Sequence, residues 1–573
     1  MTVTRARGWA ILALTTGGPA GCGPDKAVES ASVSLSATDP SSGTDSGGVP
    51  TGGDSTTLLM EGENTVLLAI NRDVDVLFVV DNSGSMAGAQ RTLARDIAAL
   101  VDRLEGVDAN YRIAITTTDS GNPRCPTSTP EGGNLVLSSC LDRADMGEFV
   151  TADEDFSTAC TDVCTLRDSD LTVKPTTTAN DDQAAPRRWV ERLEGELNID
   201  GVADAAGALK CYLPQGVAGC GFEAPLESMY LALAKSQDSQ SKANYGFLRE
   251  AAQLAVVVVS DETDCSYSPA NKEIFTTNKV FWNSPDDPAP TSAMCWRAGV
   301  ACTGGSPFSE CHAENYDLAG GPGASDTEAV LQPVSKYIDF LAGIQDAKQN
   351  LDGDQHIKVA LITGVPVGYD SFASELEYAD SPDPQVQAAF GVGPGCVLDD
   401  PELGPRLAVP PVREREVAEA FQVEQDARSL YSICQSDFTA PLDAIGASIA
   451  DDVKPTCFPN CVADTDPDTE LLEPACKIYE DDPLGGTHTE IALCDAGADG
   501  WAVPPGQTVC WAARLDGAAK LTPSKLDDMS QACIDGGFNL EILLIRSAPA
   551  APLAEISGAC QLSPNKQQDC PNL

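Results

Sequence analysis

Basic side chains and histidines are scarce in this chain. Its 573 residues include 36 Lys and Arg against 86 Asp and Glu, and only three His, which gives a formal net charge of −50. Binding to nucleic acid depends on clustered Lys and Arg that neutralise phosphates, so the composition argues against a nucleic-acid partner. An acidic surface of this kind favours solubility and weak, diffuse binding of cations.

The common catalytic motifs are also missing. H-E-x-x-H, G-x-S-x-G and the phosphate-binding G-x-x-x-x-G-K-[ST] pattern are all absent from the sequence. The histidines, His312, His356 and His488, lie far apart in the chain, and none pairs with an obvious nucleophile. We therefore expect a protein without enzymatic activity. The alternative is chemistry carried by the cysteine-bearing insertions of the central region.

The N-terminal apolar run is too short to cross a membrane. Arg5 and Arg7 precede the apolar stretch 9–14, and small residues follow, which is the pattern of an export signal. Pro19-Ala20-Gly21-Cys22 resembles a bacterial lipobox, although Leu is usual where Pro19 stands. We expect residues 1–22 to be a signal peptide and Cys22 to be lipidated, with the lipid as the only membrane contact. Ordinary signal-peptidase cleavage is the alternative.

Cysteine usage points to an oxidising compartment. There are 21 cysteines, and setting Cys22 aside leaves an even twenty, enough for ten disulfides. Zinc is disfavoured because histidines are few and no C-x₂-C pattern repeats. The connectivity stays open, but four pairs are plausible from their short spacing: Cys160/Cys164, Cys211/Cys220, Cys125/Cys140 and Cys457/Cys461.

Apolar runs and helical periodicity predict an α/β region over about 64–455. Its expected strands are Val74–Val80, Tyr111–Thr117, Leu254–Ser260 and Ile357–Thr363. The spacing of apolar residues predicts helices over 90–104 and 441–450. At nearly four hundred residues the region is about twice the common size of such a domain, and the excess is assigned to two insertions near 119–210 and 262–322.

The flanking segments differ in composition from this region. Residues 23–63 are rich in Ser, Thr, Gly and Asp and predict a flexible linker. Residues 456–573 predict a small, disulfide-rich and mostly β domain, with its clearest strand over 538–546. Asp464, Asp466 and Asp468 form a D-x-D-x-D run, but Pro467 interrupts it and no Gly or distal Glu completes a calcium loop. A polar linker is therefore the better interpretation of this run.

The most informative stretch directly follows the strand 74–80. Asp81, Ser83 and Ser85 occupy alternate positions of one turn, and Gly84 lets the backbone fold closely around an ion. Carboxylate and hydroxyl oxygens are hard ligands of the kind that Mg²⁺ takes in an octahedron, usually with some waters retained. This predicts a divalent-cation site on an exposed loop with a coordination position left for a partner.

This D-x-S-x-S-M pattern resembles the metal-ion-dependent adhesion site (MIDAS) of von Willebrand factor type A (VWA) domains. The resemblance implies a doubly wound, mostly parallel α/β sheet with the ion at the carboxyl ends of its strands. It also implies that Asp261, at the end of the strand 254–260, is a ligand from another loop. Glu223, just before a helix that begins near Pro225, stands where the family usually has a Thr. The expected metal ligands are thus Asp81, Ser83, Ser85, Glu223 and Asp261.

A third carboxylate at Glu223 has an electrostatic consequence. Two carboxylates roughly neutralise a divalent cation, whereas three should hold the metal more tightly and attract an acidic ligand less. The resemblance implies Mg²⁺, Ca²⁺ or Mn²⁺ as cofactor and adhesion to a protein or matrix partner. The cysteine-rich insertions further resemble bacterial VWA lipoproteins of the outer membrane or cell surface. The alternative is a cell-envelope scaffold whose metal site is structural or degenerate.

Overall fold

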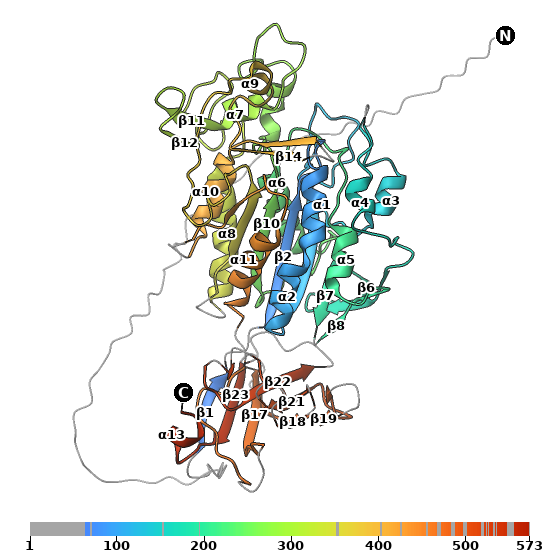
Figure 1. Cartoon of the computed structure of the whole chain (residues 1–573), viewed down its shortest axis with the longest axis vertical. Coiled ribbons are helices and arrows are strands. Elements are labelled where there is room, and N and C mark those ends of the chain that lie inside the picture. The colour runs from blue at the N-terminus through green and yellow to red at the C-terminus, as the bar shows by residue number, and fades with distance from the viewer. Residues whose placement is uncertain are drawn as a thin grey trace, which may run out of the picture. The chain divides into compact units, whose positions relative to one another are not determined.

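The computed structural model describes residues 63–68 and 72–573, except short internal gaps (Figure 1). These gaps are 152–153, 194, 351–354, 401–403, 424–426, 454–455, 467–470, 483–486, 497–500, 517–520, 523, 525, 531–532, 535, 547–554 and 572. The predicted signal peptide, the lipidation at Cys22, the linker 23–62 and Asp468 lie outside the described residues.

A seven-stranded sheet forms the centre of the α/β unit, in the order β16-β13-β10-β2-β3-β7-β8. Strands β2, β3, β10, β13 and β16 are parallel, while β7 and β8 add an antiparallel edge. The bounds are β2 Asp73–Val80, β3 Asn110–Thr117, β7 Trp189–Leu193, β8 Glu196–Leu197, β10 Gln253–Val259, β13 Lys358–Thr363 and β16 Leu430–Ser432. The predicted doubly wound, mostly parallel sheet is therefore confirmed.

Helices cover both faces of this sheet because the side chains of its central strand alternate between two cores. Val76, Phe78 and Val80 of β2 pack in the core that contains α1 (Ala87–Asp96), α2 (Ala98–Gly106), α5 (Ala205–Tyr212) and α11 (Thr439–Ala450). Leu77 and Val79 pack in the core that contains α6 (Pro225–Ser236), α8 (Val334–Gln349) and α10 (Val412–Ala420). The single helix predicted over 90–104 is two helices that meet at Ile97.

The first insertion adds small helices and hairpins outside the main sheet and also extends the sheet itself. It carries α3 (Cys140–Asp145), α4 (Thr158–Thr161), β4 (Thr172–Val173), β5 (Pro175–Thr178), β6 (Asp181–Pro186) and β9 (Ile199–Asp200), as well as β7 and β8. Four residues of β7 pair with β3. Part of the segment predicted to be an insertion thus forms the edge of the main sheet.

The second insertion contains a short 3₁₀ helix over Pro269–Phe275, α7 (Ala293–Gly299) and a hairpin of β11 (Val300–Thr303) and β12 (Glu310–Ala313). It has a small core of its own around Phe275 and Met294. After β13 the chain adds α9 (Pro384–Phe390) and a hairpin of β14 (Cys396–Asp400) and β15 (Gly404–Ala408).

A six-stranded sheet organises the C-terminal part, in the order β1-β23-β17-β18-β21-β22. Its strands are β1 Glu63–Leu68, β17 Cys476–Asp482, β18 Thr487–Leu493, β21 Val509–Arg514, β22 Glu541–Arg546 and β23 Glu555–Gln561. The small strands β19 (Asp495–Ala496) and β20 (Trp501–Ala502) and the helix α13 (Lys566–Asp569) complete this part. β1 pairs antiparallel with β23 along its full length, so residues 63–68, which the sequence placed at the border of the α/β region, belong to this sheet.

Ten disulfides join the twenty cysteines other than Cys22, as the cysteine count predicted. The four pairs suggested from short spacing are wrong. The bonds that replace them are Cys125–Cys220, Cys140–Cys160, Cys164–Cys211, Cys457–Cys533 and Cys461–Cys570. They close loops of up to 109 residues, because each cysteine pairs with the partner that packing brings near, not with its neighbour in the chain.

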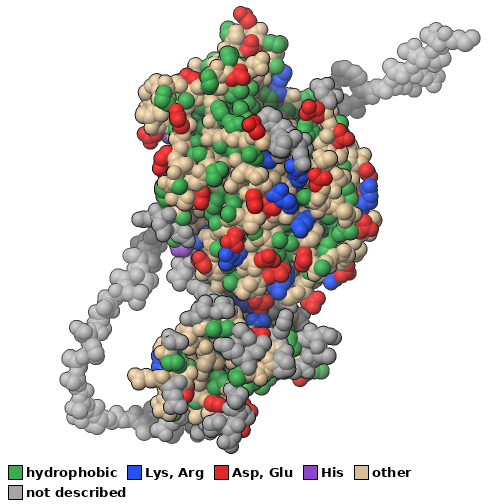
Figure 2. Space-filling view, viewed as in Figure 1, with side chains coloured by type: hydrophobic (Ala, Val, Ile, Leu, Met, Phe, Trp, Pro, Cys, Tyr) green, Lys and Arg blue, Asp and Glu red, His purple; other side chains and the backbone are tan. Residues whose placement is uncertain are grey.

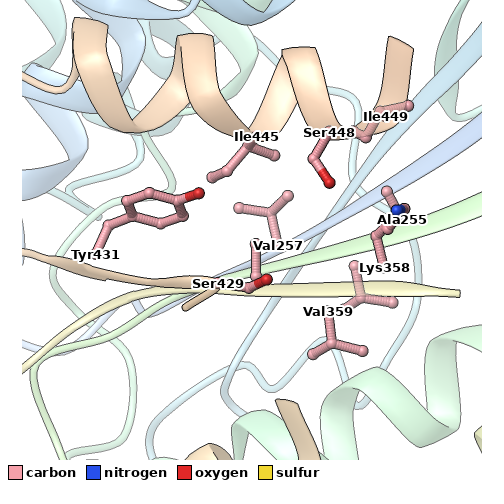
Figure 3. Close-up of a pocket in the computed structure, with 11 residues that line it drawn as sticks. Ala255, Val257, Lys358, Val359, Ser429, Tyr431, Ile445, Ser448 and Ile449 are labelled. Atoms are coloured by element: carbon pink, nitrogen blue, oxygen red, sulfur yellow. The ribbon is translucent and has the colours of Figure 1, made fainter. Parts of the chain in front are cut away.

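Among the described residues, no helix combines the length and apolarity needed to cross a membrane. A cavity of about 10 Å³ lies between α11 and the strands β10 and β13, with Ile445 and Ser448 pointing toward the sheet (Figure 3). This volume holds about one water molecule at most, so the cavity has no room for an organic substrate.

Candidate metal centre

The motif that follows β2 lies where the direction of winding of the sheet reverses. Counted along the chain, the strands β2, β3, β7, β10, β13 and β16 are arranged 3-2-1-4-5-6, so the switch point falls between β2 and β10. Open α/β sheets place their ligands in the crevice beyond the carboxyl ends of the strands at this point. Val80 is in register with Val259, so Asp81 and Asp261 leave neighbouring strand ends.

Hydrogen bonds hold Asp81 in one orientation. Its Oδ1 accepts a bond of 2.7 Å from the backbone N–H of Ser83, and its Oδ2 accepts one of 2.6 Å from the Ser260 hydroxyl. The Asp81 backbone N–H donates to the carbonyl of Val259 at 2.9 Å, which ties the turn to β10. The side chain of Asp81 is fully buried.

The two serine hydroxyls connect this turn to Asp261. Ser83 Oγ lies 3.2 Å from Ser85 Oγ, and the Ser85 hydroxyl donates to Asp261 Oδ1 at 3.0 Å. Oxygens on adjacent corners of an octahedron around Mg²⁺, at the usual metal–oxygen distance, are about 2.9 Å apart. The spacing of these oxygens therefore fits a shared hard cation.

Glu223 comes to the same edge from the loop before α6. It is fully buried, its Oε2 accepts a hydrogen bond from the Thr118 hydroxyl, and the N–H of Ala224 donates to the Thr118 carbonyl at 3.0 Å. Thr118 directly follows β3, and its own N–H donates to the carbonyl of Val80. The sequence showed no Thr near Glu223, but the fold brings Thr118 into contact with it from 105 residues away.

Several residues of the centre were missed from the sequence: Ser260, Thr118, Asp119 and Glu262. The last two could have been found because each lies within two residues of the end of a predicted parallel strand, where polar side chains gather at one edge. Ser260 was included in the predicted strand, whereas its side chain turns to Asp81.

Four buried carboxylate oxygens of this edge have no hydrogen-bond partner among the described residues. They are Asp261 Oδ2, Glu223 Oε1, Glu262 Oε2 and Asp119 Oδ2. Unpaired buried carboxylate oxygens are costly unless the group is protonated, hydrogen-bonded to water or bound to a cation. Within the described residues, however, no three His, Cys, Asp or Glu side chains converge closely enough to hold a metal by themselves. A cation here would thus depend on the serine hydroxyls as well as on Asp81 and Asp261.

Burial and mutual repulsion disfavour the ionised form of the carboxylates at this edge. Burial raises the pKa of Asp81, and burial together with the Asp81 charge raises the pKa of Asp261 to about 8. Burial, followed by repulsion from Asp81, also raises the pKa of Glu223 and of Glu262 well above the ordinary value. The Arg406 guanidinium, from β15, is the charge that opposes this effect at Asp261.

The centre opens to solvent at the tip of its first loop. Gly84 and Ser85 are exposed, and a side chain added at Gly84 would meet no other atom within 4 Å. Ser83, by contrast, is buried. The second insertion lies at the rim: Cys265 N–H donates to the Glu223 carbonyl at 2.6 Å, and the Ser292 hydroxyl donates to the Gly221 carbonyl at 2.8 Å.

The strand order and the loops that carry Asp81 and Asp261 agree with the resemblance seen in the sequence. The α/β unit has the doubly wound, mostly parallel sheet that this resemblance implied. No protein-family model matches the chain, and no curated protein matches it in sequence.

Among solved structures the chain is similar to the pilus adhesin SpaC of Lactobacillus rhamnosus GG, with 11% identity and a TM-score of 0.25, over 87% of this chain and 40% of SpaC. It is also similar to the vWF domain of the type V pili tip protein Mfa5 of Porphyromonas gingivalis, with 10% identity and a TM-score of 0.25, over 68% of this chain and 97% of that domain. A von Willebrand factor type A structure from Catenulispora acidiphila matches with 10% identity and a TM-score of 0.22, over 87% of this chain and 60% of that one.

Proposed function

We propose that this chain is an exported, non-enzymatic binding protein that engages a protein or matrix partner through a divalent cation held at the end of β2. The observation that supports this most directly is the meeting of Asp81, Ser83, Ser85 and Asp261 at the switch point, with an unpaired buried oxygen on Asp261. The exposed Gly84–Ser85 tip leaves that place accessible to a large partner.

Each residue has a distinct role in this proposal. A bound Mg²⁺, Mn²⁺ or Ca²⁺ would supply a positive charge and an open coordination position at the surface. Asp81, fixed by Ser83 N–H and Ser260, would hold the ion from the β2 side. Asp261 and the Ser85 hydroxyl, already 3.0 Å apart, would hold it from the β10 side and from the exposed tip.

Export is supported by the disulfides. Ten cystines in one chain are typical of proteins that fold outside the reducing cytosol. We propose further that Cys22 is lipidated and anchors the chain to the cell envelope. Mass spectrometry of the mature N-terminus tests this point, because ordinary cleavage would leave no lipid mass on Cys22.

The function is tested by a pull-down from envelope and extracellular material with the full chain loaded with Mn²⁺. We expect a partner that is captured by the native protein, lost in excess EDTA, and lost in Asp81→Ala. Asp102→Asn is a matched control because it removes an exposed carboxylate far from the proposed cation. Asp102 lies on α2, whose C-terminal end leads into the start of β3, at the edge of the sheet opposite the ends of β2 and β10. Capture that is unchanged in EDTA would refute a cation-dependent function.

A structural metal site is the second candidate. It is favoured by the burial of Asp81, Ser83, Glu223 and Asp261, which leaves little of the ligand set at the surface. In that case Mn²⁺ would raise the melting temperature of the native protein, and no partner would show metal-dependent binding.

A further inference from the structure

The helix α6, which follows the Glu223 loop, has no capping side chain of its own. Its N-cap position is occupied by Ala224, which has no side-chain oxygen to accept a hydrogen bond. The first N–H groups of a helix have no partner within the helix and are commonly satisfied by a Ser, Thr, Asp or Asn side chain at the N-cap. The start of α6 therefore needs acceptors from elsewhere in the chain.

Those acceptors come from the loop that carries Asp261. Asp264 Oδ1 accepts a hydrogen bond of 3.2 Å from the N–H of Leu226, and the Ser266 hydroxyl oxygen accepts one of 2.9 Å from the N–H of Glu227. The Ser266 hydroxyl in turn donates to Asp264 Oδ1 at 2.5 Å. The cap of α6 is thus supplied by residues three and five positions after Asp261.

The residue between these two joins the same loops. Cys265 N–H donates to the Glu223 carbonyl at 2.6 Å, and its side chain forms a disulfide with Cys295 on α7. We call Asp264–Cys265–Ser266 the inter-loop cap. Through its hydrogen bonds to residues 223–227 it fixes where the Glu223 loop lies relative to Asp261.

A buried ion pair holds the inter-loop cap from the side of α10. Arg413 Nε donates to Asp264 Oδ2 at 3.0 Å, and Arg413 Nη2 donates to the carbonyl of Gln332, whose N–H donates to the Ser266 carbonyl. Charged side chains are spread over the visible face of the molecule (Figure 2), but Asp264 and Arg413 are both 0% exposed. Because separating a buried pair leaves two charges without counter-ions, the pair disfavours any movement of Asp264 away from α10.

We propose that the inter-loop cap positions the cation centre, by setting the separation of the loops that carry Glu223 and Asp261 before an ion binds. Asp264 and Ser266 are positioning residues, since they act through the backbone of the two loops and not as ligands. This inference rests on the proposed function, because it concerns the same cation.

The physical reason is that only molecules with the loops already in place bind the ion at full strength. In the metal-free chain that arrangement buries Asp261 Oδ2 and Glu223 Oε1 without hydrogen-bond partners among the described residues, which opposes it. The bonds of the inter-loop cap offset this cost. Loss of one capping side chain shifts such an equilibrium about fivefold, so the apparent affinity for the ion should fall by about that factor.

Ser266→Ala in the full chain, with Mn²⁺ as the probe, tests this without a change of charge. Electron paramagnetic resonance of free Mn²⁺ gives the dissociation constant, which we expect to rise about fivefold. Ser139→Ala is the matched control, because Ser139 is also fully buried and its hydroxyl caps α3 and donates to the Leu166 carbonyl within the first insertion. Urea unfolding in EDTA measures the stability of each metal-free variant.

The outcomes separate this inference from the proposed function. Both serine variants should be less stable than the native protein, since each loses a cap, but only Ser266→Ala should bind Mn²⁺ more weakly. Native Mn²⁺ affinity in Ser266→Ala, or an equal loss in Ser139→Ala, would overturn the inference and leave cation binding intact. A native protein that binds no Mn²⁺ would overturn the proposed function and this inference with it.

A second variant approaches the inter-loop cap from α10. Arg413→Lys keeps the charge but lacks the planar group that bonds Asp264 and the Gln332 carbonyl together. We expect it too to raise the Mn²⁺ dissociation constant, and it decides the matter if Ser266→Ala does not fold. Unchanged Mn²⁺ affinity in Arg413→Lys would then overturn the inference.

Discussion

Removing the metal should make this protein lose stability as the pH rises. Burial, reinforced by the charge of Asp81, raises the pKa of Asp261 to about 8 in the absence of metal. The unfolded chain releases the same proton near pH ~4. Between these values the folded state binds more protons than the unfolded state, so the free energy of unfolding falls with increasing pH. A bound cation holds the carboxylate ionised and removes this dependence.

The size of the effect follows from the number of protons. One retained proton corresponds to about 1.4 kcal/mol per pH unit. From about pH 5 to about pH 7, the free energy of unfolding in EDTA should fall by about 3 kcal/mol relative to that in excess Mn²⁺. If Glu223 or Glu262 also retains its proton, the slope is steeper, since burial raises the pKa of both.

Urea unfolding followed by tryptophan fluorescence, without reductant, measures this difference. Other titrating groups, such as Glu414 with its pKa raised to about 8 mainly by burial, contribute equally with and without Mn²⁺ and cancel in the comparison. Asp261→Asn should lose the response to Mn²⁺ and, in EDTA at neutral pH, be more stable than the native protein. Parallel pH profiles in EDTA and Mn²⁺ would show that no cation is linked to these carboxylates, and the reasoning would fail.

Two further predictions concern the scaffold. Replacing Cys140 and Cys160 by Ser removes a disulfide with a sequence separation of 20 residues. We expect the free energy of unfolding, measured in urea, to fall by about 3 kcal/mol. A loss near zero would mean that the loop is ordered without the disulfide. Phe78→Ala empties a fully buried position in the core below α1 and should cost about 3–5 kcal/mol by the same measurement, with Leu193→Ala on an exposed site as a control that changes little.

The central strands were predictable because they are buried on both faces. A strand of that kind must be a continuous apolar run, and β2, β3, β10 and β13 differ from their predicted bounds by one residue at most at either end. Asp81 and Asp261 were predictable for the same reason, since each follows such a run. The break at Ile97 was not predictable, because the helical periodicity continues across it.

The approach of Thr118 to Glu223 could not be predicted from local patterns. These residues are 105 positions apart, and their contact depends on how β3 and the loop before α6 are placed by the two cores. The same holds for β1, whose pairing with β23 joins residues nearly five hundred positions apart. Composition around residues 63–68 carries no sign of such a partner.

What the sequence determined by itself is the local part of this protein: apolar strands, the oxygen-rich turn after the first of them, and a cysteine content that requires oxidation. The periodicity of apolar residues that marks a strand or a helix spans only a few positions, so these features can be recognised in the sequence alone. Only the tertiary structure decided which cysteines bond, which sheet β1 joins, and that the Thr118 hydroxyl donates a hydrogen bond to Glu223. Those outcomes depend on packing between segments far apart in the chain. The same packing determines which charged side chains surround the proposed cation.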